Sequence, residues 1–421
     1  MKHTLALMGG KPTRKKPFTS WPIFNKSEEK SLLRTLRSGK WGRLQGDEVS
    51  KFEQRFAAAH GCKHGIAVVN GTVSLRIGLL AAGIKAEDEV IVPPYTFLST
   101  ASAVVESNAV PVFADIDPHT FNLDPKTVEA AITPRTKAII PVHFAGQPAD
   151  MTALMALAKK HNLFVIEDAA HAHGAIQGGK SAGSIGNLGS FSFQSSKNMT
   201  AGEGGIITTN DDALAESCRS IQSCGRVQGG LWYEHHVISG NYRLGEFQGA
   251  LLSCQLARLE DQTNRRDRNG QYLAAELIKI PGIIPQKRSI DCTRHSYHLF
   301  MMRIDPQQFG VSRSTLIKAL QAEEIPCSAG YGFSLPQQPL FQNKAFGPYL
   351  HKASAKLNFR KVRCPQSDLL CHEQCVWLEH SMFLGKRADM DDISEAFQKI
   401  YAHRETLNAH VLSSPLTQGP V

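Results

Sequence analysis

Short apolar runs alternate with segments of helical periodicity between residues 50 and 210. The apolar runs are rich in Val and Ile, and they predict strands at 65–69, 89–92, 110–114, 138–142 and 164–167. The segments between them predict helices at 51–60, 73–82, 100–107, 125–131 and 151–161. Short buried strands that are each followed by a helix are typical of a parallel sheet covered on both faces. We therefore predict a doubly wound α/β sheet, in which ligands bind beyond the carboxyl ends of the strands.

The pattern changes after residue 245. A long helical passage at 245–280 contains a charge-dense stretch at 265–268, near which we place the start of a new unit. That unit is predicted to contain a strand at 298–304 and helices at 312–322 and 391–406. The predicted organisation is an N-terminal arm (1–30), a large domain (31–265), a smaller C-terminal α/β domain (266–410) and a disordered tail (411–421).

Composition narrows the class of protein. The chain has 421 residues, of which 42% are hydrophobic and 20% charged, so that disordered and collagen-like proteins are excluded. No apolar stretch approaches the roughly 18 residues of a membrane span, and we expect a soluble, cytoplasmic protein with no membrane partner. The net charge of +9 is spread along the chain, so that we expect no nucleic-acid partner, although it favours an anionic substrate.

The cysteines fit a reducing compartment. There are nine, an odd number, and most lie in apolar segments where a thiol packs as a small hydrophobic group. The one local cluster consists of Cys364, Cys371, His372 and Cys375. It lacks the close Cys-x-x-Cys pairs of a zinc site, so we expect packing and no metal.

An anion site is indicated at Asn70-Gly71-Thr72, which follows the strand at 65–69 and opens the next helix. Free backbone N–H groups and the helix dipole meet at such a point. An ordinary turn with a Thr cap is an equally simple interpretation of these three residues. The turn matches neither a Walker loop nor a Gly-x-Gly-x-x-Gly fingerprint, which argues against triphosphatases and dinucleotide enzymes.

A carboxylate follows the strand at 164–167. Asp168 stands at the carboxyl end of this strand and needs a cationic partner if it is buried. A structural helix cap is the alternative for Asp168. His171 and His173 resemble metal ligands, but a His-x-His pair without further ligands is weak evidence.

A lysine lies in a segment of small residues. Lys197 follows the apolar Phe191-Ser192-Phe193 and precedes the glycine cluster at 202–205. Partial burial lowers the pKa of a lysine towards neutrality, which suits an amine that attacks a carbonyl carbon. Taken alone, Lys197 is more often an ordinary surface lysine.

The three segments together are more specific than any one of them. A phosphate cradle, a carboxylate for a pyridinium nitrogen and a lysine for an aldehyde are the groups that pyridoxal 5′-phosphate requires. Their order along the chain resembles that of fold-type I transferases such as aspartate aminotransferase, in which a mainly parallel sheet forms the large domain.

The resemblance extends to the DegT/DnrJ/StrS family of sugar and cyclitol aminotransferases, and it covers nearly the whole chain. It rests on segments that include 9–12, 21–22, 38–42, 70–72, 93–97, 141–143, 240–243 and 377–381, together with the Asp168 and Lys197 segments. In combination these motifs are specific.

The resemblance implies roles for individual residues. Lys197 looks like the lysine that binds the cofactor's aldehyde carbon and then shuttles a proton, and Asp168 would keep the ring nitrogen protonated. Phe97 would stack on the ring, and Gly71, Thr72 and Ser192 would bind the phosphate. The family's equivalent of Asn241 reaches the cofactor phosphate of a neighbouring subunit, which implies a homodimer with shared active sites.

Other positions carry the resemblance less far. His171 is a further cofactor contact, and it stands where many relatives that act on nucleotide-linked sugars carry Gln. His at this position resembles the branch with scyllo-inosose aminotransferases and 3-amino-5-hydroxybenzoate synthases. The segments that line the acceptor pocket in the family contain Trp41, Arg43, His143, Arg226, Tyr233 and Tyr331.

The expected activity is a ping-pong transamination that depends on pyridoxal phosphate. The amino donor is L-glutamate or L-glutamine, and the acceptor is a nucleotide-linked keto-sugar or a keto-cyclitol. One alternative is a dehydratase similar to aminohydroxybenzoate synthase. The other is a non-catalytic regulator that binds the cofactor, and the presence of both Lys197 and Asp168 argues against it.

Overall fold

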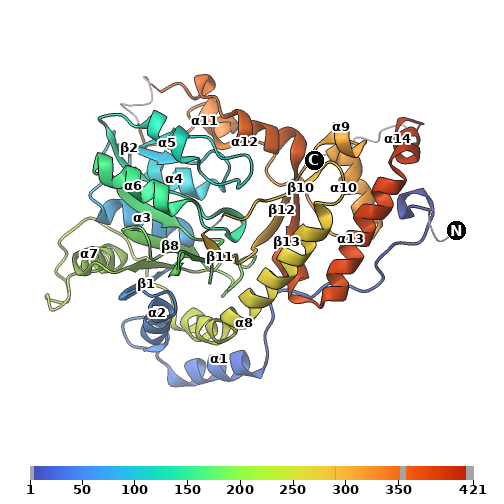
Figure 1. Ribbon diagram of the computed structural model, residues 1–421. Helices are drawn as coiled ribbons and strands as arrows, with labels where there is room; N and C mark the ends of the chain where they lie inside the picture. The colour runs from blue at the N-terminus through green and yellow to red at the C-terminus, as the bar shows by residue number, and fades with distance from the viewer. Residues whose placement is uncertain (1–3, 290, 351–356, 414–421) are drawn as a thin grey trace.

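A seven-stranded sheet forms the centre of the molecule (Figure 1). The computed structural model describes residues 4–289, 291–350 and 357–413. The strands lie in the order β1 (His64–Val68), β9 (Gly205–Thr209), β8 (Leu188–Ser192), β5 (Phe164–Asp168), β4 (Thr136–Ile139), β2 (Glu89–Val92) and β3 (Val110–Phe113). The pairs from β8 to β3 are parallel, and β9 runs antiparallel to both of its neighbours. This confirms the predicted α/β class with a mainly parallel sheet.

Both faces of this sheet are buried, because successive side chains of each strand enter different apolar clusters. In β2, Val90 and Val92 pack into one cluster and Ile91 packs into the other. The first face is covered by α3 (Gly71–Ala81), α4 (Ser99–Glu106) and α7 (Asp212–Gln222). The opposite face is covered by α5 (Pro125–Ala131) and α6 (Met151–His161), and near β1 by α2 (Glu48–Ala59). The predicted strand 89–92 and helices 125–131 and 151–161 are confirmed with these bounds.

A second, antiparallel sheet follows in the C-terminal part. Its strands are β10 (Ile283–Pro285), β12 (Leu299–Ile304) and β13 (Cys375–Glu379), with β12 in the middle. The helices α10 (Arg313–Ala322) and α13 (Arg387–Ala402) share an apolar cluster with it. A third small sheet joins β6 (Ile176–Gln177), β7 (Lys180–Ser181) and β11 (Cys292–Arg294). The other helices are α1 (Lys26–Ser38), α9 (Pro306–Phe309), α11 (Pro339–Gln342), α12 (Pro365–Leu369) and α14 (Arg404–Ser413).

One long helix, α8 (Glu246–Leu277), connects the two parts (Figure 1). It packs against α1 and α2 near its start and against α13 and β10 further along. The helix runs without a break through the charge-dense stretch at 265–268, where the sequence indicated the start of a new unit. The proposed division at residue 265 therefore falls inside a helix, and it stays a prediction.

The predicted tail at 411–421 lies mostly outside the described residues. Among the helices of the described chain, none combines the length and the apolar character needed to cross a bilayer.

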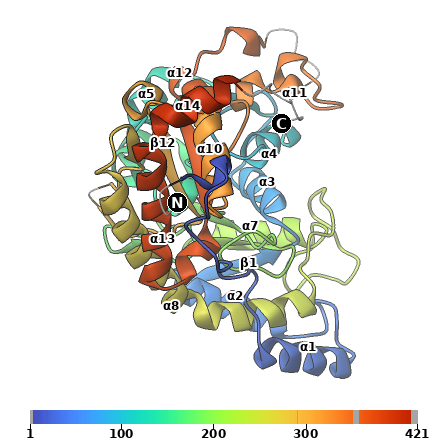
Figure 2. The ribbon, with the colours of Figure 1, turned by 90° about the vertical axis from the view of Figure 1, so that its right-hand side faces the viewer.

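The N-terminal arm is fixed to the C-terminal part. Figure 2 shows it descending from beside α10 towards α1 at the base of the molecule. Arg14 is buried and forms ion pairs with Asp389 (2.8 Å) and Asp392 (2.7 Å) of α13. Glu323 accepts hydrogen bonds from the N–H groups of Ala6 and Thr13, both at 2.8 Å. Arg14 and Glu323 therefore anchor the arm to the C-terminal part.

Glu323 makes this anchor depend on pH. Its burial disfavours the charged form, but the hydrogen bonds from Ala6, Lys399 and Thr13 outweigh burial and lower its pKa. Ionised Glu323 therefore stabilises the fold above the ordinary glutamate pKa, and this contribution is lost as the pH falls below that value. We expect Glu323→Gln to lower the free energy of unfolding at pH 7 by about 2–4 kcal/mol.

Urea unfolding at pH 7 and at pH 4 measures this contribution. The difference from the wild type should shrink at the lower pH. Glu324→Gln is the matched control, because Glu324 is the exposed neighbour of Glu323. An equal loss in the two variants, or a loss that grows as the pH falls, would contradict the assigned role.

Candidate active site

A cavity of about 720 Å³ lies beyond the carboxyl ends of the parallel strands. Asp168 ends β5, Ser192 ends β8, and the turn after β1 leads directly into α3. The cavity brings together eight of the residues that the sequence predicted: Gly71, Thr72, Phe97, Asp168, His171, Ser192, Lys197 and Tyr331. The sheet topology explains why they meet, since the ends of neighbouring parallel strands share one edge.

The start of α3 forms the anion cradle at one end of this cavity. The side chain of Asn70 caps the helix by accepting a hydrogen bond from Val73 N–H at 2.9 Å. The first-turn N–H groups of a helix have no partner within it and are free to bind an anion. A Cβ atom at Gly71 would lie 2.7 Å from Ser192 Cβ, so only glycine allows the two segments to approach so closely. The hydroxyls of Thr72 and Ser99 are hydrogen-bonded at 2.6 Å beside the cradle.

Asp168 is a buried carboxylate with two hydrogen-bond donors. Thr100 donates its hydroxyl to Oδ2 at 2.8 Å, and Ala170 donates its N–H to Oδ1 at 3.3 Å. Burial raises the pKa of Asp168, while the Thr100 and Ala170 hydrogen bonds and the charge of Lys197 act in the opposite direction. Asp168 is therefore a carboxylate that gains from a cationic partner in the cavity.

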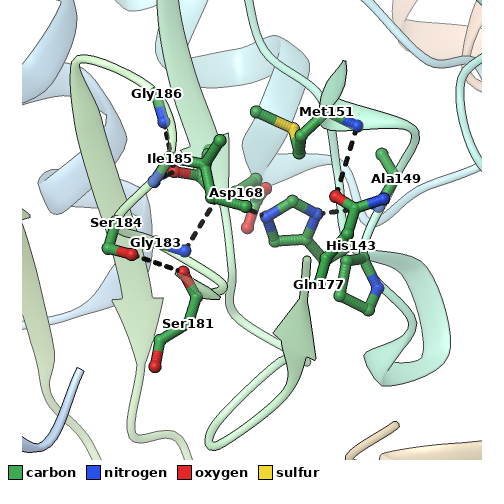
Figure 3. Close-up of polar contacts among 12 residues, drawn as sticks. His143, Ala149, Met151, Asp168, Gln177, Ser181, Gly183, Ser184, Ile185 and Gly186 are labelled. Carbon is green, nitrogen blue, oxygen red and sulfur yellow. Dashed lines mark hydrogen bonds and ion pairs between the residues drawn. The ribbon is translucent and has the colours of Figure 1, made fainter. Parts of the chain in front are cut away.

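The residue before Asp168 fixes the end of the strand. Glu167 is fully buried and accepts hydrogen bonds from Gly183 N–H (2.8 Å), from the N–H groups of Ile185 and Gly186 (2.6 Å each) and from His143 Nε2 (2.8 Å). Figure 3 shows His143, Gly183, Ile185 and Gly186 gathered near Asp168. Such a network positions the backbone from which the Asp168 side chain projects into the cavity.

His143 belongs to this network. Its Nδ1 accepts from Ala149 N–H at 3.0 Å, so its Nε2 carries the proton that it donates to Glu167 (Figure 3). The ring is fully buried and is not among the described residues that line the cavity. The structure thus places His143 behind the cavity, although the sequence predicted that it contacts the substrate that accepts the amino group.

Lys197 lies in the loop between β8 and β9. Its backbone N–H donates to Gln194 O at 2.9 Å, and its side chain enters the cavity that contains Asp168. Burial lowers the pKa of Lys197 to about 8, while the charge of Asp168 acts to raise it. An appreciable fraction of this amine is therefore unprotonated near neutral pH, which is the state needed for attack on a carbonyl carbon.

Three histidines form part of the cavity wall. Burial lowers the pKa values of His171, His298 and His380 well below the ordinary value, so that all three are uncharged near neutral pH. The rings of His171 and His298 lie 4.1 Å apart between centroids. Tyr331 and Trp377 extend the same wall, with ring centroids at 4.9 Å.

The sequence interpretation missed several residues of the site. Thr100 lies in the first turn of α4, and no pattern in the sequence shows that its hydroxyl points towards Asp168. Trp21, His298, Trp377 and His380 also line the cavity, but they come from the arm and from the second sheet. Their place in the site depends on packing between distant segments, which no local pattern reveals.

Other predicted residues do not line the cavity within this chain. The indole N–H of Trp41 donates to Leu36 O at 3.0 Å, and Arg43 pairs with Glu53 at 2.9 Å. The remaining three lie between α7 and α8: Arg226 stacks on Trp232 at 4.7 Å, Tyr233 is 82% exposed, and Asn241 is exposed. The loop that carries Arg226 and Tyr233 projects from the body of the molecule (Figures 1 and 2).

These features fit pyridoxal phosphate. The helix start with its glycine at the point of closest approach suits a phosphate, Asp168 suits a protonated ring nitrogen, and Lys197 suits an aldehyde. All three groups line one cavity.

Comparisons with known proteins agree with this assignment. The model of the DegT/DnrJ/EryC1/StrS aminotransferase family matches residues 22–381. The chain is 38% identical to the L-glutamine:2-deoxy-scyllo-inosose aminotransferase of Micromonospora echinospora, over 95% of this chain and 99% of that protein. It is also 38% identical to the 3-amino-5-hydroxybenzoate synthase of Amycolatopsis mediterranei, over 91% of this chain and 97% of that one.

Solved structures share the fold. The crystal structure of a 3-amino-5-hydroxybenzoic acid synthase superposes with a TM-score of 0.83 at 36% identity, and the match covers 93% of this chain and all of that one. The expected family, fold type, enzyme class and cofactor are thereby confirmed. The chain belongs to the DegT/DnrJ/EryC1/StrS family of pyridoxal phosphate-dependent aminotransferases.

Proposed function

We propose that this aminotransferase moves the amino group of L-glutamine to a ketone on an uncharged cyclitol ring. The choice of an uncharged acceptor rests on the charged groups that line the cavity. Among the described residues that line it, Lys197 is the only lysine or arginine. The carboxylates of Asp168, Glu203 and Glu379 face the same space.

This arrangement disfavours a nucleotide-linked sugar. A diphosphate buried without a cation loses its hydration and gains no ion pair in return. The neutral imidazoles of His171 and His298 and the phenol of Tyr331 instead offer polar groups that suit the hydroxyls of a ring. The choice of L-glutamine rests on relatives such as the Micromonospora echinospora enzyme, whose name specifies that donor.

Lys197, Asp168 and Thr100 have different roles in the reaction. Pyridoxal phosphate, when bound, supplies an aldehyde that accepts an amino group and a ring that takes up electrons. Lys197 Nζ acts as the nucleophile in its unprotonated state and afterwards takes up and releases a proton. Asp168 keeps the ring nitrogen protonated, and Thr100 keeps the Asp168 carboxylate oriented.

Other residues hold the cofactor. Gly71, Thr72 and Ser192 surround the start of α3 and bind the phosphate. Phe97 is 60% exposed at the cavity and is free to cover one face of the ring. His171 packs against His298 in the cavity wall and contacts the cofactor ring of its own subunit.

We also infer a homodimer with shared active sites. The loop after α7 exposes four large apolar side chains to solvent: Leu231, Trp232, Tyr233 and Ile238. Such an exposed apolar patch is typical of a surface that a second subunit covers. Tyr233 of this loop, and Asn241 after it, then reach the active site of the second subunit, whereas Arg226 stays stacked on Trp232 of its own loop. All nine cysteines are free thiols, which supports a cytoplasmic location.

A test of the acceptor uses enzyme first incubated with L-glutamine and then freed of it. We expect 2-deoxy-scyllo-inosose to be aminated with a single-turnover second-order rate constant at least about 100-fold above that of a nucleotide-linked keto-sugar, because the diphosphate is left unpaired. Mass spectrometry of the product identifies the reaction. Loss of water with new ring unsaturation would favour the dehydratase, and preference for the nucleotide-linked ketone would contradict the proposed acceptor.

A second test concerns the lysine itself. In the cofactor-free protein, the pH dependence of Lys197 modification by an amine reagent should have its midpoint near the pKa of about 8. Asp168→Asn should move that midpoint to lower pH, because the carboxylate that favours the charged amine is gone. Peptide mass spectrometry measures both. A midpoint at the ordinary lysine value of about 10.4 would show that Lys197 is not buried.

A further inference from the structure

The two residues beside Lys197 are both held by histidines of the second sheet. His298 directly precedes β12 and His380 directly follows β13. These strands are antiparallel neighbours in which Leu299 lies opposite Glu379, so the two histidines stand at the same end of the sheet. Their rings are 5.6 Å apart between centroids.

His380 holds the residue before the lysine. Its Nε2 lies 3.0 Å from the carbonyl oxygen of Ser196, and its Nδ1 lies 3.2 Å from Nη2 of Arg266. A guanidinium group can only donate, so Nδ1 must accept and the proton must be on Nε2. Arg266 therefore fixes the tautomer in which His380 donates a hydrogen bond to Ser196.

His298 holds the residue after the lysine. The Asn198 side chain donates through Nδ2 to Ser296 O at 2.8 Å, which leaves its Oδ1 as an acceptor. His298 Nδ1 lies 3.1 Å from this oxygen and is thus the donor. Asn198 is buried, so that these hydrogen bonds face little competition from water.

The arm adds a third contact. Trp21 donates its indole N–H to Ser195 O at 3.0 Å, and its ring packs edge-on against His380 at 4.7 Å. The backbone before Lys197 and the Asn198 side chain after it are therefore held by the arm and the second sheet, whereas the lysine itself belongs to a loop of the first sheet.

Arg266 is buried beside His380, and its guanidinium carbon also lies 5.5 Å from the centre of the Trp21 ring. Its side chain is fully buried in α8, and no carboxylate of the described residues lies within ion-pair distance of it. Its Nε and Nη1 have no hydrogen-bond partner in the described part of the chain. A buried charge without a counterion destabilises a fold, and an apolar residue of similar size is often as good or better.

We propose that His380 and His298, with Arg266 behind His380, are positioning residues that set where the Lys197 amine lies in the cavity. This inference rests on the proposed function, in which Lys197 is the lysine that reacts. It gives the second sheet a role in the reactivity of Lys197, which lies in a loop of the first sheet.

The test compares four variants of the full-length protein. His380→Leu removes the donor to Ser196, whereas His380→Gln keeps an N–H group at the same distance along the side chain. Arg266→Met removes the group that fixes the tautomer. His60→Leu is the matched control, because His60 is also buried and also hydrogen-bonded to a backbone carbonyl, at 2.9 Å from Phe56 O, but contacts no residue beside Lys197.

The first readout needs no cofactor. The rate at which a limiting amine reagent modifies Lys197 should change by about fivefold or more in His380→Leu and Arg266→Met, because one buried hydrogen bond is lost. It should stay within twofold of the wild type in His380→Gln and His60→Leu. The second readout is the visible circular dichroism of the reconstituted enzyme, which should weaken in the same two variants.

The stability of Arg266→Met distinguishes a residue that positions Lys197 from one that only stabilises the fold. We expect its urea midpoint to equal or exceed that of the wild type while Lys197 modification changes. Unchanged modification in both Arg266→Met and His380→Leu, or an equal change in His60→Leu, would overturn the proposal. If borohydride reduction of the wild type attaches the cofactor to another residue, the proposed function fails instead, and the cofactor-free readout still decides the role of the histidines.

Discussion

The site depends on the burial of an amine and a carboxylate in one cavity. Burial drives both groups towards their neutral forms, lowering the pKa of Lys197 and raising that of Asp168, and the attraction between their charges opposes both shifts. The result is a lysine whose pKa of about 8 lies close to neutral pH, beside a carboxylate with two hydrogen-bond donors. The fold supplies this environment because strands β5 and β8 end side by side and the start of α3 lies against Ser192 at the end of β8.

Two sheets contribute to that environment in different ways. The first carries the reacting groups, and the Glu167 network behind Asp168 fixes the end of its strand. The second carries no group that the sequence marked as catalytic, yet its histidines contact the residues on either side of Lys197. The long helix α8 belongs to both parts, and it places Arg266 behind His380. A change in the packing of the second sheet would therefore reach the lysine through two hydrogen bonds.

The sequence predicted those parts of the site that lie in continuous motifs. Asp168, Lys197 and the turn at Gly71 each follow a recognisable strand, and parallel topology brings strand ends together. Thr100 was missed because the sequence does not show that α4 turns one of its hydroxyls towards Asp168. His298, His380 and Trp21 were missed because they meet the site only through tertiary packing. His143 was expected in the cavity but is engaged behind it by Glu167 and Ala149. The long helical passage at 245–280 was predicted and corresponds to α8, whereas the charges at 265–268, which were interpreted as the start of a new unit, lie within that helix. The residues after α7 stay a prediction, since their proposed role needs a second subunit.

The central claim is that Lys197 binds pyridoxal phosphate and gives it up to an amino donor. The most direct measurement is the visible absorption spectrum of the purified protein, recorded before and after addition of L-glutamine. The account predicts a visible band from lysine-bound cofactor that bleaches when the donor is added and returns when an acceptor ketone follows. Absence of any such band after incubation with pyridoxal phosphate, or a band that no amino donor affects, would contradict the account.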